Sequence, residues 1–122
     1  MNVGVVCGSD KWTDVDAVER ALAGAGDDPG VDMVVMPASL SGFPAIPAEI
    51  ARKHDLIPVC YEQDDASELA AAMVRRATIE RDFGLHVRGF AFLVNGDEDG
   101  REIARQLQAE GIEVIVSEVE LG

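Results

Sequence analysis

Basic side chains are scarce in this sequence, which has 10 lysines and arginines against 23 aspartates and glutamates and a formal net charge of −13. Only Lys11 and Lys53 are lysines. Because proteins hold the phosphate backbone of nucleic acids through lysine and arginine, we expect no direct nucleic-acid binding. The acidic residues are scattered over expected helices and form no blocks, which favours a solvated acidic surface over mimicry of DNA.

Long apolar runs are also missing. No stretch reaches the roughly 18 to 20 apolar residues that a membrane span needs, and no basic segment with a following apolar run marks a secretory signal. We therefore expect a cytoplasmic protein without a membrane partner. The two cysteines, Cys7 and Cys60, have neither CxxC nor metal-ligand spacing. Both are expected to be buried thiols and not a disulfide, with a nucleophilic Cys7 as the alternative.

Apolar residues, by contrast, make up 48% of the 122 residues, enough for one domain with one core. Short apolar runs predict five strands, several of them continuous as in sheets that are covered on both faces. The strands are expected near Val3–Cys7, Met33–Met36, Ile57–Tyr61, Phe90–Val94 and Val114–Val116.

Four amphipathic segments between these runs predict helices near Asp14–Ala25, Pro44–His54, Asp65–Arg81 and Gly100–Glu110. Thr13 or Asp14 can cap the first helix, and Gly111 can end the last. The residues expected to face the core are Val15, Val18 and Leu22 in the first helix, Ile46 and Ile50 in the second, Leu69, Met73 and Ala77 in the third, and Ile103 and Leu107 in the fourth.

Strict alternation of strands and helices predicts an α/β fold: a single Rossmann-like domain over residues 1–122, with a five-stranded, mainly parallel sheet and helices on both faces. We expect the strand order 3-2-1-4-5. In such sheets a ligand binds at the carboxyl ends of the strands, where the strand order reverses. That order places the Gly8–Thr13 loop beside the Asn95–Gly100 loop.

The turn after the first strand reads Gly8-Ser9-Asp10-Lys11-Trp12-Thr13-Asp14 and leads into a helix with Val18 and Leu22. This stretch resembles the opening of YspA-like proteins, which belong to the SLOG superfamily with the LOG enzymes and DprA. The resemblance continues from Ser41 to Ala51 and ends at Asn95–Arg101. It implies a Rossmann-like fold with a phosphate and ribose site at these loops.

The sequence departs from the family pattern at its charged positions. Asp10 stands where the family has arginine, Ala38 and Ser39 stand for paired glycines, Pro44 stands for an aspartate, and Arg101 stands for a threonine. Replacing a cation by an acid about 4–6 Å from a phosphate costs several kcal/mol at an effective dielectric near 20. The phosphate site is therefore expected to be degenerate.

Several residues at these loops have both a binding and a structural interpretation. Ser9 can donate to a ligand or close the turn, and Lys11 can replace the missing arginine or only raise solubility. Trp12 can stack on a base, fill a subunit interface or pack over the first helix. The expected ligand-binding residues are Gly8, Ser9, Asp10, Lys11, Trp12, Ser39, Gly42, Asn95, Gly96, Gly100 and Arg101.

The same loops offer little for catalysis or metal binding. Asp10, Asp97, Glu98 and Asp99 can neighbour one another and could hold Mg²⁺, but their spacing matches no calcium loop and favours a solvated acidic cluster. His54 and His86 have no partner at ligand spacing. Glu49 is the one acid near the loop after the second strand, Pro37–Phe43, that could act as a base. We assign no catalytic residue, no metal and no cofactor.

Three functions remain open. The first is a binding module of SLOG type for a nucleotide-derived small ligand. The second is a non-catalytic interaction or structural protein with a decayed pocket, and the third is a nucleotide N-glycosidase or phosphoribohydrolase. We also expect a homo-oligomer, because the stretch Ala70–Val74 gives the third helix apolar residues on more than one face.

Overall fold

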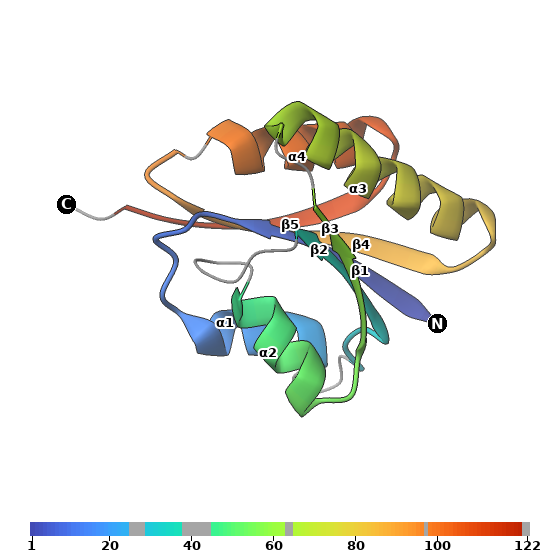
Figure 1. Cartoon of the computed structure of the whole chain (residues 1–122), viewed down its shortest axis with the longest axis horizontal. Helices are drawn as coiled ribbons and strands as arrows, with labels where there is room; N and C mark the ends of the chain where they lie inside the picture. The colour runs from blue at the N-terminus through green and yellow to red at the C-terminus, as the bar shows by residue number, and fades with distance from the viewer. Residues whose placement is uncertain (25–28, 38–44, 63–64, 97, 121–122) are drawn as a thin grey trace.

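Five parallel strands form one sheet in the order β3-β2-β1-β4-β5 (Figure 1). The computed structural model describes residues 1–24, 29–37, 45–62, 65–96 and 98–120. The predicted α/β, Rossmann-like fold and its strand order are confirmed. The strands are β1 (Asn2–Gly8), β2 (Met33–Pro37), β3 (Ile57–Tyr61), β4 (His86–Val94) and β5 (Glu113–Val119).

Two helices cover each face of the sheet, as Figure 1 shows. On one face lie α1 (Val15–Ala23) and α2 (Ala45–Lys53), and on the other lie α3 (Ala66–Asp82) and α4 (Glu98–Ala109). The chain therefore has three layers, with the sheet in the middle. Buried residues divide into two apolar clusters, one between the sheet and each pair of helices.

The central strand β1 supplies both clusters. Val3, Val5 and Cys7 join the cluster under α3 and α4, whereas Val6 joins the cluster under α1 and α2. Successive side chains of a strand point to opposite faces. Because helices cover both faces, the strand needs apolar residues at both parities, which is why its sequence is a continuous apolar run.

Several element boundaries differ from the prediction, and two of the differences concern β4 and α4. β4 begins at His86, four residues before the predicted Phe90, because Val87 and Arg88 pair with Val3 and Gly4. Because Arg88 is charged and a glycine follows it, the sequence has no continuous apolar run over this part of the strand. Helix α4 begins at Glu98 and not at Gly100, so Gly100 is part of a helix and not of the preceding loop.

The residues expected to face the core do so with one exception, since Val15 is 46% exposed. A helical side chain points back towards the N-terminus of its helix. At the first position of α1, the side chain of Val15 therefore extends beyond the helix and not over the sheet. Val18 and Leu22, one and two turns later, are fully buried.

The expectation of two buried thiols is wrong for Cys60. Cys7 is buried, but Cys60 is exposed, and both thiols are free. β3 is an edge strand. Val59 and Tyr61 pack against the cluster under α3 and α4, so the alternating position Cys60 points to the opposite face, where it remains exposed.

The ends of α1 and α4 follow the predicted signals. Asp14 caps α1, because its side chain accepts a hydrogen bond from the backbone N–H of Ala17 at 3.1 Å. Gly111, with φ of 80°, follows α4 in the left-handed conformation that ends many helices. The alternative cap Thr13 is not used.

Removing the cap of α1 should lower stability. We expect Asp14→Ala to reduce the free energy of unfolding by about 0.5–2 kcal/mol, because the N–H of Ala17 loses its acceptor. Urea unfolding measures this loss. The matched control is Asp10→Ala, which removes the same charge from an exposed residue outside the helix. Equal losses in the two variants would show that charge, and not capping, is the cause.

Candidate functional site

The candidate site lies at the carboxyl ends of β1 and β4. The chain passes from β1 to β2 and β3 on one side, and then to β4 and β5 on the other, so strand order reverses between β1 and β4. This is the position at which ligands bind in open α/β sheets. The predicted neighbourhood of the two loops is confirmed, because the turn after β1 is hydrogen-bonded to the end of β4.

Ser9 makes that connection. Its backbone N–H donates to the carbonyl of Phe92 at 2.9 Å, and its Oγ accepts from the N–H of Val94 at 2.9 Å. The carbonyl of Ser9 accepts from the N–H of Trp12, which closes the turn. The structure therefore gives Ser9 the structural role that the sequence left open, extending the β1–β4 pairing by one residue.

Cys7 and Gly100 bring the start of α4 against the end of β1. The thiol of Cys7 is buried and lies 3.6 Å from the carbonyl oxygen of Gly100 and 3.8 Å from that of Phe90. Gly100 is itself buried in the first turn of α4. Because a nucleophilic thiol needs access to its substrate, this position does not support the alternative of a reactive Cys7.

Trp12 is part of the core. Its side chain is 6% exposed, its ring lies 5.2 Å from the ring of Phe92, and its Nε1 donates to the carbonyl of Asp14 at 2.8 Å. Val18 and Leu22 belong to the same cluster. Packing over the first helix is therefore the alternative that the structure supports. The ring is not presented to solvent, where it could stack on a base or meet a second subunit.

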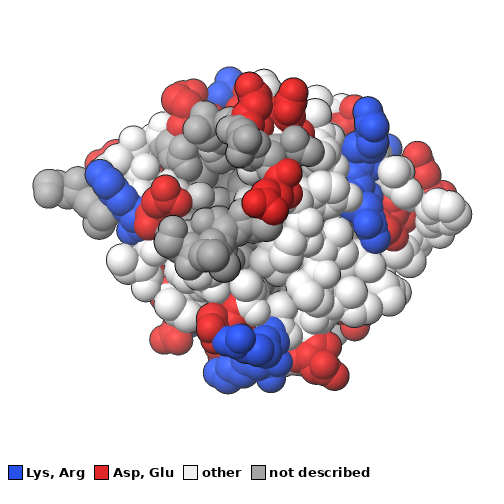
Figure 2. Space-filling model, viewed as in Figure 1, with Lys and Arg blue, Asp and Glu red and all other residues white. Residues whose placement is uncertain are grey.

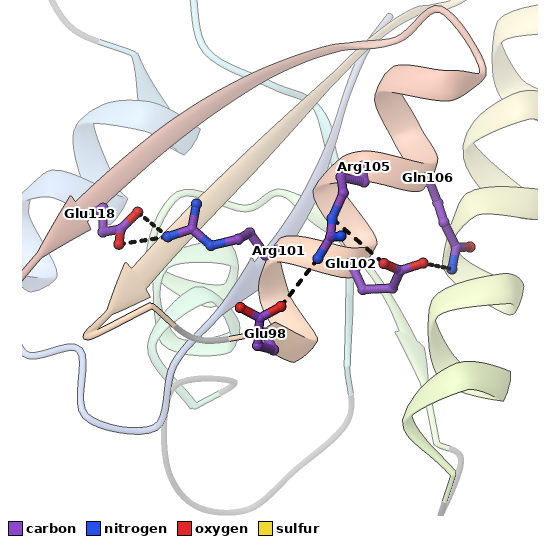
Figure 3. A network of polar contacts seen from close by, with 6 residues as sticks. All are labelled: Glu98, Arg101, Glu102, Arg105, Gln106 and Glu118. Atoms are coloured by element: carbon purple, nitrogen blue, oxygen red, sulfur yellow. Dashed lines mark hydrogen bonds and ion pairs between the residues drawn. The ribbon is translucent and has the colours of Figure 1, made fainter.

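Arg101, the expected phosphate contact, is already paired. Its Nη2 donates to both carboxylate oxygens of Glu118 on β5, at 2.6 and 2.5 Å (Figure 3). Figure 3 also shows Arg105, one turn further along α4, between Glu98 and Glu102. An anionic ligand that recruits Arg101 must compete with the carboxylate of Glu118.

Glu118 is the contributor to this edge that the sequence analysis missed. The predicted strand order could have indicated it, because a carboxylate near the end of the fifth strand comes close to a helix that begins at the end of the neighbouring fourth strand. The prediction located that strand only at Val114–Val116, whereas β5 continues to Val119. The short predicted strand left Glu118 outside the sheet.

Some of the remaining expected residues are described by the structure and others are not. Asp10 and Lys11 are exposed, and Asn95 and Gly96 form the turn between β4 and α4 with φ of 53° and 74°. A Cβ at Gly96 would meet no atom within 4 Å, so the space on that side of Gly96 is open, whereas the N–H of Asn95 donates to the carbonyl of Val119. Gly8 ends β1. Ser39 and Gly42, together with Ala38, Pro44 and Asp97, lie outside the described residues.

The structure describes Glu49, His54 and His86, which the sequence analysis weighed for catalysis or metal binding. Glu49 is exposed and forms an ion pair with Arg52, whose hydrogen bond lowers the pKa of Glu49 and so weakens it as a base. His54 follows α2 and lies 3.6 Å from Glu19. His86 is the first residue of β4 and so lies at the amino ends of the strands, away from the candidate site. The described residues also contain no group of three or more metal-ligating side chains.

Figure 2 shows the face of the molecule that includes β3. The chain has more acidic than basic residues, and on this face the lysines and arginines form separate groups. Near the β1–β4 junction the exposed charges include Asp10, Lys11 and Glu98. Lys11 is the exposed cation of the first turn, and Asp10 stands directly before it. Their opposite charges leave little net attraction for a phosphate.

Comparison with known proteins gives no relative. No family model matches the chain, and no curated protein or solved structure is similar to it. Within the described ranges, no helix is both long and apolar enough to cross a membrane. Functional inference therefore depends on the geometry of the chain itself.

Ser9 provides a direct test of the structural role of this turn. We expect Ser9→Ala to lower the free energy of unfolding by about 1–3 kcal/mol, because the buried N–H of Val94 loses the acceptor that Ser9 provides. Thermal or urea unfolding measures this. The control is Thr13→Ala, which removes a hydroxyl from an exposed residue of the same turn. A Ser9→Ala protein as stable as the wild type would contradict the structural role.

Proposed function

We propose that this protein is a non-catalytic binding module for a small, nucleotide-derived ligand, of the kind found in the SLOG superfamily but with a degenerate phosphate site. The observation that carries the proposal is the junction of β1 and β4 at the point of strand reversal. There a hydrogen bond to Ser9 connects the turn after β1 to β4, and the turn after β4 contains Gly96, which has open space on its Cβ side. This is the position where related architectures bind nucleotides.

The charges around that junction favour a ligand with little negative charge. Asp10 offsets the adjacent Lys11, Arg101 is neutralised by Glu118, and Glu98 is paired with Arg105. What remains to attract a phosphate is the partial charge of a helix N-terminus, about half an elementary charge. A nucleoside or a similar neutral group therefore fits this edge better than a nucleoside di- or triphosphate.

A binding role fits better than an enzymatic one. The glycosidase members of the family that the sequence resembles need an arginine and a glutamate in this region, but Glu49 and Arg52, which could supply them, are paired with each other on the exposed surface of α2. The thiol of Cys7 is buried, and the Oγ of Ser9 accepts from the backbone of β4. Both cysteines are free thiols, which suits the reducing cytoplasm where we propose that the protein acts.

The interaction role remains the second candidate, because one edge strand carries exposed branched residues. Ile115, Val116 and Val119 on β5 are each more than 40% exposed. Ile115 and Val119 share one face of the strand, and neighbouring exposed apolar side chains are typical of protein–protein contacts. An interaction through β5 does not exclude ligand binding at the β1–β4 junction.

Calorimetric titration with adenosine, AMP and ADP tests the proposed ligand class. We expect adenosine to bind most tightly and each added phosphate to weaken binding by about fivefold or more at low salt. Tighter binding of ADP than of adenosine would contradict the degenerate phosphate site. If none of the three binds at millimolar concentration, the small-ligand proposal fails and the interaction role is favoured.

Replacing Asp10 tests the origin of the charge effect. We expect Asp10→Arg to tighten AMP binding by about 5- to 20-fold, or roughly 1–2 kcal/mol, because attraction replaces repulsion at the first turn. The gain should shrink as salt rises. The matched control is Asp82→Arg, which makes the same charge change at the exposed end of α3. A similar gain in both variants would assign the effect to net charge and not to the first turn.

A further inference from the structure

The two edges of the sheet differ in their capacity to accept another strand. β3 and β5 are the edge strands (Figure 1). An edge strand exposes unpaired N–H and C=O groups that can pair with another chain, and natural proteins block such edges with proline, charge or bulges. Which residues expose these groups follows from the hydrogen bonds that each strand makes inward.

β3 is blocked at its second residue, Pro58. The N–H of Ile57 donates to Asp32 at 2.8 Å, so Ile57 and its alternating neighbours Val59 and Tyr61 direct their backbone groups towards β2. Pro58 and Cys60 therefore direct theirs outward. Proline has no N–H, so the outer edge of β3 lacks one of its two outward donors, although the surface above this strand is largely uncharged (Figure 2).

β5 has no such block. The N–H of Asn95 donates to the carbonyl of Val119 at 3.0 Å, which shows that Val119 faces β4. Alternation along the strand then directs the N–H and C=O groups of Val114, Val116 and Glu118 away from the sheet. All three residues retain their N–H, and β5 contains no proline.

We propose that β5 is the interface through which a second copy of this chain binds, in antiparallel pairing centred on Val116. In that register Val116 faces Val116 of the other copy, and Val114 faces Glu118. About six backbone hydrogen bonds form, two for each hydrogen-bonded pair. The two small sheets then become one continuous sheet about a twofold axis.

The side chains of β5 suit this self-pairing. Glu113 lies opposite Val119, and Glu118 lies opposite Val114, so no two carboxylates face each other directly. Ile115 lies opposite Ser117 and diagonal to Ile115 of the second copy, so the 44% exposed Ile115 side chains meet near the axis. A register shifted to centre on Glu118 would place two carboxylates opposite each other, which is destabilising.

This interface replaces the one expected from the sequence. The stretch Ala70–Val74 of α3 does not form an apolar surface, because Ala70, Met73 and Val74 are buried against the sheet. β5 instead carries three large exposed apolar residues, Ile115, Val116 and Val119, whereas the described side chains of α3 include one, Ile79. One strand pair covers less than the roughly 1,600 Å² of a standard interface, so we expect a dissociation constant of about 1–100 µM.

Net charge should make this dimer sensitive to salt. Each copy carries a formal charge of −13, and two such chains repel each other. The screening length falls from about 10 Å at 0.1 M salt to about 3 Å at 1 M. We therefore expect the dissociation constant to fall as salt rises, whereas an interface held by opposite charges would weaken.

Sedimentation equilibrium tests the proposal with two matched variants. Ile115→Lys places a cation at the axis, and we expect it to raise the dissociation constant at least about tenfold, although it lowers the net negative charge. Ile57→Lys makes the same change at the other edge, at a residue 46% exposed compared with 44% for Ile115, and should leave the dissociation constant unchanged.

A third variant tests the backbone itself. Val116→Pro removes the central outward N–H of β5, as Pro58 does on β3, and should also weaken association. Circular dichroism and urea unfolding of each variant show whether it folds. A wild-type protein that is monomeric at about 500 µM in roughly 0.5 M salt overturns the proposal. Loss of the dimer in Ile57→Lys, with retention in Ile115→Lys, overturns it as well.

Discussion

The pairing of β1 with strands on both of its sides is the constraint on which the rest of the structure depends. Val3, Val5 and Val6 are fully buried, β2 lies on one side of β1, and β4 lies on the other. A strand in this position must be apolar on both faces, because helices cover both of them. Polar side chains can therefore reach solvent and a ligand only beyond its last paired residue.

Ser9 marks that transition, and its position explains the character of the candidate site. A serine at the end of a buried strand can turn its hydroxyl to a ligand or back to the sheet. Here its Oγ accepts from Val94, and its N–H donates to Phe92. Arg101 is similarly occupied by Glu118. The N–H of Ser9 and the guanidinium of Arg101 are thus engaged within the chain, and Lys11 is offset by Asp10, which is the physical basis for proposing a ligand of low charge.

The fold could be predicted because its signals are local and repeated. Continuous apolar runs locate buried strands, amphipathic segments locate helices, and strict alternation predicts a parallel sheet. The errors occur where tertiary contacts override local pattern. Arg88 lies inside β4 because β1 pairs along its whole length, and Cys60 is exposed because its strand has no outer neighbour.

The candidate site was harder to predict, because its character depends on how each polar group is satisfied. The sequence identified Ser9, Trp12 and Arg101 as residues of interest, but each had a binding and a structural interpretation. Geometry distinguishes them: Trp12 is buried against Phe92, and Arg101 finds a partner 17 residues later in the chain. Such a partner has no periodic signal, since nothing in a local pattern records which carboxylate a distant strand will bring to a helix.

The two proposals involve the same strand without conflict. The side chain of Glu118 points to α4 and neutralises Arg101, while its backbone groups face away from the sheet. In a β-strand, these two directions are perpendicular, so one residue can hold an intrachain ion pair and still take part in pairing with another chain. An isolated ion pair on an exposed edge contributes little to stability. Pairing of the backbone at Glu118 would hold the carboxylate more firmly in place, so assembly through β5 would keep Arg101 engaged and the β1–β4 junction unfavourable to phosphate.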